Sequence, residues 1–157
     1  MSRTAPAHVE VLSPVAGVRH DVSDVPDPVF AQGLVGPGAA ITPHPGDQVA
    51  VAPIDGTLTK LHPHAYLIVS DLGPGVLVHL GIDTVHMHGA GFTMLAQEHS
   101  TVTAGTAIIR WDPGYVEETG RSAMCAVVVL DCPFPAVPLQ PSGREIDMAQ
   151  PLFKIDL

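Results

Sequence analysis

The chain has 157 residues, of which 46% are hydrophobic and 15% are charged, and its formal net charge is −9. A chain of this length can fold as one domain with a substantial buried core. Nucleic acids and anionic membrane surfaces attract cationic patches, and the sequence shows none, so we expect neither as a partner. An acidic protein instead suits a partner with a positive face.

The composition favours an all-β fold. The 15 glycines and 16 prolines leave little room for long helices but suit short strands joined by tight turns. The sequence contains no apolar segment of the length that a signal peptide or a membrane-spanning helix needs, so we expect no membrane insertion. Cys125 and Cys132 are the two cysteines, and we interpret them as core residues of a cytoplasmic protein.

In chain order, residues 1–8 show no periodicity and predict a flexible N-terminus, followed by a single domain over residues 9–157. Asp24–Ala31 predicts an irregular loop with one short helical turn. Short apolar runs bounded by Gly and Pro predict strands at 9–12, 65–69, 75–80, 126–130 and 150–155. One more strand is predicted to begin at 18, one to end at 41, two to lie within 49–61 and one within 101–109.

Helices are expected to be few and short. The best candidate is 112–120, where Asp112 can cap the first turn, Pro113 suits the first position and Gly120 ends the segment. Residues 93–99 predict one or two amphipathic helical turns. Residues 133–143 contain four prolines and predict a loop.

Two segments of the chain resemble each other. Residues 9–18 and 49–61 both consist of an apolar strand, then Ser-Pro or Ala-Pro, then a Gly and a second strand. This likeness is either weak internal pseudo-symmetry or coincidence.

One histidine lies in a run that otherwise predicts a buried strand. His79 is the single imidazole between Val76 and Ile82, and five of the nine histidines fall within residues 62–88. Residues 70–74 predict the turn of a hairpin between the strands 65–69 and 75–80. Because antiparallel neighbours run in opposite directions, His64 and His79 are expected to meet at one rim of the sheet.

Such a pair permits three kinds of chemistry beside a purely structural role. A neutral imidazole of His79 could accept a phosphoryl group, with Gly81 allowing close approach of main-chain donors and Asp83 holding the tautomer. A zinc ion could instead bind the two H-x-H pairs, His62 with His64 and His86 with His88, if each pair lies on a strand. Cys/His catalysis lacks a local sequence signature around either cysteine.

Several segments together resemble the glucose-type enzyme IIA domain of the bacterial sugar phosphotransferase system. The strongest motif is Gly75–Val85, with the sequence GVLVHLGIDTV, and it is preceded by His64–Ile68. Other segments agree in order and spacing, namely 13–17 (SPVAG), 24–31 (DVPDPVFA), 33–36 (GLVG) and 51–57 (VAPIDGT).

The resemblance implies a compact antiparallel β-sandwich or barrel and a phosphohistidine relay. By motif position, His79 would accept a phosphoryl group from the phosphocarrier protein HPr and pass it to a cysteine of a sugar-specific IIB domain. His64 would orient His79 and stabilise the phosphoryl group. Asp27, Val29, Phe30 and Asp83 match positions on the docking face of the family. The resemblance implies a free-standing cytoplasmic carrier.

The resemblance implies no bound cofactor; an adventitious or partner-shared zinc ion would lie at His64 and His79. Two alternatives stay open, a zinc-dependent peptidase-like β-barrel using H-x-H ligands and a regulatory module that binds target proteins. The sequence also departs from the family. The connection before His64 is shorter than usual, His62 replaces a common threonine, and segment 131–148 matches weakly.

Overall fold

The computed structural model describes residues 8–157, so most of the predicted N-terminal tail, residues 1–7, lies outside the described part. These residues form fourteen short strands, two α-helices and two 3-10 helices. The strands are β1 (His8–Leu12), β2 (Gly17–Asp21), β3 (Gly38–Pro43), β4 (Gln48–Val51), β5 (Gly56–His62), β6 (Ala65–Val69), β7 (Gly75–Leu80), β8 (Phe92–Met94), β9 (Thr101–Val102), β10 (Ala107–Trp111), β11 (Cys125–Leu130), β12 (Ala136–Pro138), β13 (Glu145–Ile146) and β14 (Pro151–Asp156). The helices are η1 (Val22–Asp24), α1 (Pro28–Ala31), η2 (Thr84–Met87) and α2 (Pro113–Glu118).

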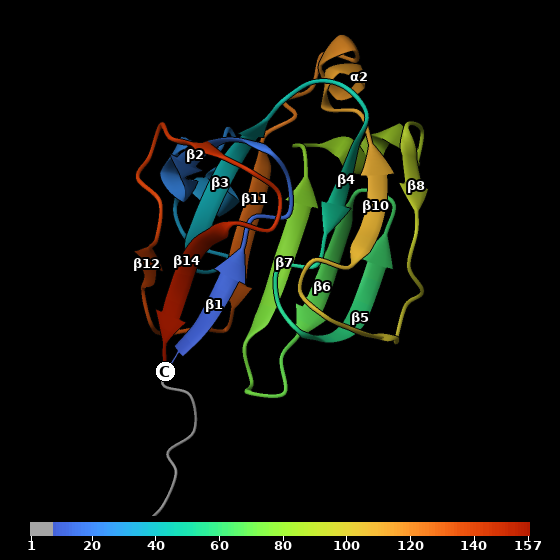
Figure 1. Ribbon diagram of the computed structural model, residues 1–157. Helices are drawn as coiled ribbons and strands as arrows, with labels where there is room; N and C mark the ends of the chain where they lie inside the picture. Colours follow the sequence, from blue (N-terminus) through green and yellow to red (C-terminus); the bar gives the residue numbers. More distant parts are fainter. Residues whose placement is uncertain (1–7) are drawn as a thin grey trace, which may run out of the picture.

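The strands form an antiparallel β-sandwich, as predicted. An eight-stranded sheet has the order β13-β2-β3-β11-β7-β6-β5-β9. Two three-stranded sheets, β1-β14-β12 and β4-β10-β8, pack against it side by side (Figure 1). The main core between these layers contains Trp111, Phe153 and Tyr66 together with the aliphatic side chains of the facing strands. The described residues include no helix whose length and hydropathy would let it cross a membrane.

The middle of the eight-stranded sheet is covered on both faces. Along β7, Val76, Val78 and Leu80 face the main core, whereas Leu77 faces a second, smaller apolar cluster. That cluster lies between the outer face of the sheet and the segment that contains η1 and α1, and its buried members are Val25, Phe30, Ala40, Ile82, Ala126 and Val128. Strands buried on both faces are continuously apolar, which explains why the run before His79 does not alternate.

The two similar segments occupy equivalent places in the sandwich. In each, the chain leaves a three-stranded sheet, turns at a proline and enters the eight-stranded sheet, from β1 to β2 and from β4 to β5. The two corners also bond to each other, because Leu12 N–H donates to the Pro53 carbonyl at 2.9 Å and Val51 N–H donates to the Pro14 carbonyl at 3.0 Å. This placement favours internal pseudo-symmetry over coincidence.

Most predicted elements are confirmed, including the β6–β7 hairpin and helix α2, whose Asp112 side chain accepts a bond from Gly114 N–H at 2.8 Å. The helical turns predicted at 93–99 are wrong, because residues 92–94 form β8 and pair with β10. The strand predicted from residue 9 begins at His8, which pairs with Asp156. The loop predicted at 133–143 includes β12, which pairs with β14.

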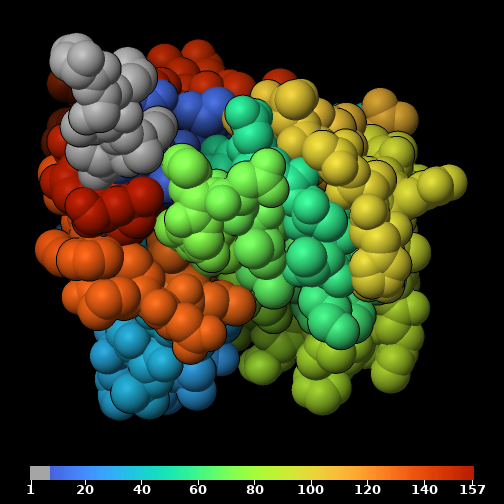
Figure 2. Space-filling model, turned by 90° about the horizontal axis from the view of Figure 1, so that it is seen from below, coloured from blue at the N-terminus to red at the C-terminus, as the bar shows by residue number. Residues whose placement is uncertain are grey.

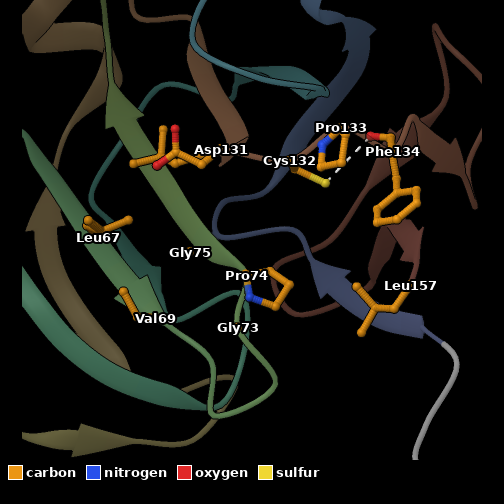
Figure 3. Close-up of a pocket in the computed structure, with 11 residues that line it drawn as sticks. Leu67, Val69, Gly73, Pro74, Gly75, Asp131, Cys132, Pro133, Phe134 and Leu157 are labelled. Carbon is orange, nitrogen blue, oxygen red and sulfur yellow. Dashed lines mark hydrogen bonds between the residues drawn. The ribbon is translucent and has the colours of Figure 1, made fainter.

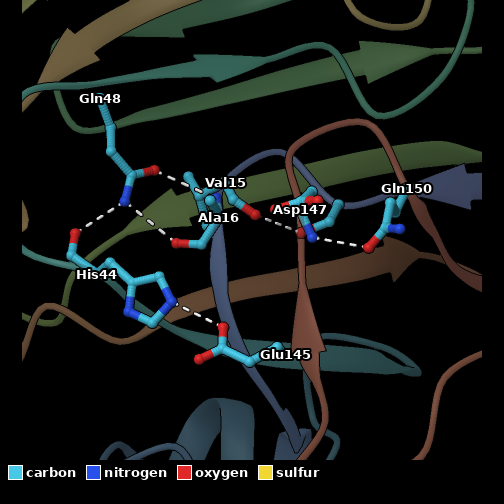
Figure 4. Close-up of polar contacts among 8 residues, drawn as sticks. Val15, Ala16, His44, Gln48, Glu145, Asp147 and Gln150 are labelled. Carbon is cyan, nitrogen blue, oxygen red and sulfur yellow. Dashed lines mark hydrogen bonds and ion pairs between the residues drawn. The ribbon is translucent and has the colours of Figure 1, made fainter.

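Side-chain contacts connect the loops next to the start of β2. His44 Nε2 lies 2.7 Å from Glu145 Oε2, and the amide of Gln48 bonds to the backbone of Ala16 and His44 (Figure 4). Glu145 begins β13, so these contacts fix the course of the segment that the sequence left open.

Candidate functional site

The candidate site lies at the rim where β7 ends. His79 is the fifth residue of β7, and on either side its register partners are Ala65 of β6 and Ala126 of β11. Directly opposite residues of antiparallel strands share a face, so two methyl groups flank the imidazole. These small neighbours leave the imidazole ring of His79 accessible at the edge of the smaller apolar cluster, which we call the outer cluster.

His64 meets His79 as the hairpin geometry predicted. It lies in the tight turn between β5 and β6, and its carbonyl accepts a bond from Leu80 N–H at 2.8 Å. The ring centroids of His64 and His79 are 5.2 Å apart, with an interplanar angle of 71°. The edge of one ring therefore faces the other.

A main-chain acceptor sets the tautomer of His79. Its Nδ1 lies 2.6 Å from the carbonyl oxygen of Gly81, and a carbonyl can only accept, so Nδ1 carries the proton. In a neutral ring, Nε2 is then the atom with a free lone pair. Nε2 is therefore available as a nucleophile.

The backbone after β7 is shaped so that this carbonyl reaches His79. Gly81 has a φ of +81°, and a Cβ there would lie 2.6 Å from Thr84 Cγ2 and 3.0 Å from the Ser122 carbonyl oxygen. Ile82 N–H donates to that same carbonyl at 2.9 Å, and the buried Thr84 hydroxyl donates to the Leu80 carbonyl at 2.8 Å. Glycine is thus required for the turn itself, rather than only for the approach of a partner.

Both imidazoles are held neutral near pH 7. The pKa of His64 is lowered from 6.5 to about 4, first by burial and then by the nearby rings of His79 and His62. Burial also lowers the pKa of His79, although the Gly81 carbonyl and the charges of Asp27 and Asp83 act in the opposite direction. A neutral ring keeps the lone pair that a nucleophile needs.

The residues predicted on the docking face lie around this rim with different exposure. The Val29 side chain is 50% exposed, and the Asp27 side chain caps α1 by accepting a bond from Val29 N–H at 2.9 Å. Asp83 is exposed and precedes η2 with a φ of +60°.

Phe30, unlike its neighbour Val29, is buried. Phe30 is only 8% exposed, and its ring centroid lies 5.5 Å from that of His79. Phe30 belongs to α1, and its side chain packs into the outer cluster beside the imidazole of His79.

The geometry required by the H-x-H metal hypothesis is absent. His86 lies in η2 and His88 follows it with a φ of +52°, so these two residues do not share the face of a strand. His62 ends β5, whereas His64 lies in the turn. Among residues 8–157, no three His, Cys, Asp or Glu side chains converge as metal ligands would.

Both cysteines are free, and Cys125 pairs with Leu80 of β7, so its side chain lies on the opposite face of the sheet from His79. Cys125 is buried in the main core as predicted, and burial raises the pKa of its thiol. Cys132 is only partly buried. It lines a largely apolar pocket of about 340 Å³ beside Phe134, Leu157 and the β6–β7 turn (Figure 3). Seen from below in Figure 2, that turn and the segment after β11 form the opposite end of the molecule, so the pocket is separate from the histidine site.

Comparisons with known proteins identify the family. Residues 9–132 match the model described as phosphoenolpyruvate-dependent sugar phosphotransferase system, EIIA 1. The glucose-specific EIIA component of Haemophilus influenzae is 37% identical over 123 residues, which are 77% of this chain and 73% of that protein. The N-acetylglucosamine-specific EIICBA component of Escherichia coli is 34% identical over 149 residues, 93% of this chain but 23% of that longer protein.

A solved structure agrees with this result. The glucose permease IIA of Mycoplasma capricolum superposes with a TM-score of 0.86 at 26% identity, over 98% of this chain and 99% of that chain. The sandwich, the rim of histidines and the sequence matches thus point the same way, and the chain belongs to the EIIA 1 family of the phosphoenolpyruvate-dependent sugar phosphotransferase system.

Proposed function

We propose that this phosphotransferase-system protein carries a phosphoryl group on Nε2 of His79, accepts it from HPr and passes it to a cysteine of a IIB domain. The observation that carries the proposal is the bond from His79 Nδ1 to the Gly81 carbonyl, which leaves Nε2 as the free nucleophile. The fused EIICBA name of the Escherichia coli relative supports a IIB domain as the acceptor.

In the first step, the Nε2 lone pair attacks the phosphorus of the donor's phosphohistidine. The new N–P bond forms as the donor's N–P bond breaks, and the donor imidazole keeps the electron pair. In the second step, the thiolate of the IIB cysteine attacks the same phosphorus. An S–P bond then forms, and the electron pair of the broken N–P bond returns to Nε2.

His64 has the place of an electrostatic partner in both steps. An N–H group at the edge of its ring can donate to a phosphoryl oxygen on His79, across the centroid separation of 5.2 Å. An in-line transfer of this kind depends on positioning and charge stabilisation. The proposed relay therefore involves no bound organic cofactor.

The test is a labelling experiment with phosphoenolpyruvate, the first enzyme of the system and HPr. We expect His79→Ala to take up no label. His64→Ala should still be labelled but should pass the label slowly to a IIB domain, because the acceptor atom remains and one stabilising donor is lost. The exposed His86 lies outside the pair, and His86→Ala should behave as the wild type does. Labelled His79→Ala protein would contradict the proposal.

A further inference from the structure

A third histidine continues the row formed by His79 and His64. The ring centroid of His62 lies 5.9 Å from that of His64, and the two planes are inclined by only 27°, which is a stacked arrangement. His64 in turn meets His79 edge-on. The middle ring of the row is therefore stacked on one imidazole and in an edge-to-face arrangement with the other.

The strand register explains this row. His62 pairs with Ala65 across the β5–β6 hairpin, and Ala65 pairs with His79 across β6 and β7. Directly opposite residues lie on one face, so Ala65 separates the two histidines and fills little of the space above the sheet. His64, in the two-residue turn, occupies the space between them.

The carboxylate of Glu98 lies near the end of β5 that carries His62. Leu61 N–H donates to Glu98 Oε2 at 2.9 Å, which fixes the carboxylate beside the end of β5. This bond is the main reason why the pKa of Glu98 is lowered, and the charges of His99, Lys60 and His62 add to the effect. His62 is thus near enough to the Glu98 carboxylate to influence its pKa, and it stacks on the ring of His64.

We propose that His62 is a positioning residue for phosphoryl transfer, whose ring stacks on His64 and holds that ring in its edge-to-face arrangement with His79. The inference rests on the proposed function. A hydrogen bond to a phosphoryl oxygen depends on the orientation of the donor. A His64 ring without its stacked neighbour can rotate, and it then spends part of its time with the N–H directed away from the phosphoryl group.

Two substitutions separate stacking from other effects of His62. In His62→Ala the stack is lost, and we expect transfer from His79 to the IIB cysteine to slow about tenfold, within the range that misplacement of a reacting group produces. In His62→Phe an aromatic face remains, and transfer should stay within about threefold of the wild type. The matched control is His86→Ala, which removes an exposed imidazole outside the row and should transfer normally.

A spectroscopic readout accompanies the kinetics. The charge of His62 is one of the causes that lower the pKa of His64, so the pKa of His64 measured by NMR should rise in both His62 variants. A mere loss of stability would not move this value, and thermal unfolding of each variant checks that the fold is intact.

The outcomes are distinguishable. Normal transfer by His62→Ala, equally slow transfer by His62→Phe, or an unchanged pKa of His64 in both variants would each overturn the positioning role. Failure of the wild-type protein to take up label on His79 would instead overturn the proposed function, whatever the His62 variants do.

Discussion

At the scale of single residues, the site depends on which nitrogen of His79 is free. The Gly81 carbonyl binds the proton on Nδ1, and burial lowers the pKa of the ring, so that the unprotonated Nε2 is the form present near neutral pH. The carbonyl reaches that position because Gly81 adopts a φ of +81° immediately after β7. The chemistry of one residue is thus set by the backbone of another.

Gly81→Ala should damage the fold and the site together. The new Cβ would lie 2.6 Å from Thr84 Cγ2, in a conformation that residues other than glycine rarely adopt. We expect a loss of about 2 kcal/mol or more in the free energy of unfolding, measured by denaturant titration. The rate of labelling at His79 should fall as well.

Gly73→Ala is the matched control for that prediction. Gly73 has a φ of +113° in the β6–β7 turn, and its Cβ would meet nothing within 4 Å. It therefore adds backbone strain without a clash, at the opposite end of β7 from the histidines. Gly81→Ala should be the less stable of the two, and the reverse order would argue against the packing around Thr84 as the cause.

The sequence identified His79 and His64 because both signals are local. One is a polar residue in an apolar strand, and the other is its position relative to a predicted hairpin turn. The roles of Ala65 and Ala126 depend on register across three strands, which no local pattern specifies. The burial of Phe30 depends on where a loop folds back over the sheet, which no local pattern specifies either.

At the scale of elements, the four-residue helix α1 packs beside His79 through Phe30. It is too short to be stable alone and is held by the Asp27 cap at its start and by Phe30 packed into the outer cluster. Asp27 thereby has two roles, since its charge also raises the pKa of His79 against the larger effect of burial.

Substitutions of Asp27 separate these two roles. Asn caps a helix about as well as Asp, whereas Ala does not, so Asp27→Ala should be less stable than Asp27→Asn by about 1 kcal/mol. Both changes remove the charge, and the pKa of His79, followed by NMR titration, should fall in both variants. Equal stability of the two variants would show that the cap contributes nothing to α1.

Elements with strong end signals were predicted well, and short strands at the edges were not. Helix α2 has Asp, Pro and Gly at the positions that start and stop a helix. The strand β8 has three residues and is defined by its pairing with β10, so periodicity over 93–99 could not reveal it. The pairings of β12 and β13 are likewise tertiary contacts of a proline-rich segment.

At the scale of the whole molecule, the topology places the site on the middle strands of the eight-stranded sheet. β7 and β11 lie in the middle of that sheet, with β2 and β3 on one side and β5 and β6 on the other. Apolar clusters cover both faces of the sheet at β7 and β11, and they exclude water except at the edge where β7 ends. The same burial that keeps the histidines neutral leads us to expect that the fold loses stability in acid.

His64 should contribute to that sensitivity. Above pH 6.5 its ring is neutral in the folded and unfolded chains, so it has no effect. As the pH falls from 6.5 to about 4, the unfolded chain binds a proton that the folded chain does not, and the free energy of unfolding decreases. Below pH 4 the ring is protonated in both the folded and the unfolded chain, so His64 changes the free energy of unfolding no further.

His64→Gln should therefore lose less stability than the wild type between pH 6.5 and 4, as measured by denaturant unfolding at a series of pH values. His86→Gln, which changes an exposed histidine, serves as the control and should follow the wild type. Identical pH dependence of His64→Gln and the wild type would show that His64 is not held neutral by the fold.

The central claim is that Nε2 of His79 carries the phosphoryl group, and NMR of the phosphorylated, nitrogen-labelled protein tests it most directly. We predict one phosphohistidine at His79, with the phosphorus coupled to Nε2 and the proton retained on Nδ1 beside the Gly81 carbonyl. Phosphorus coupled to Nδ1, or phosphohistidine at a residue other than His79, would contradict the account.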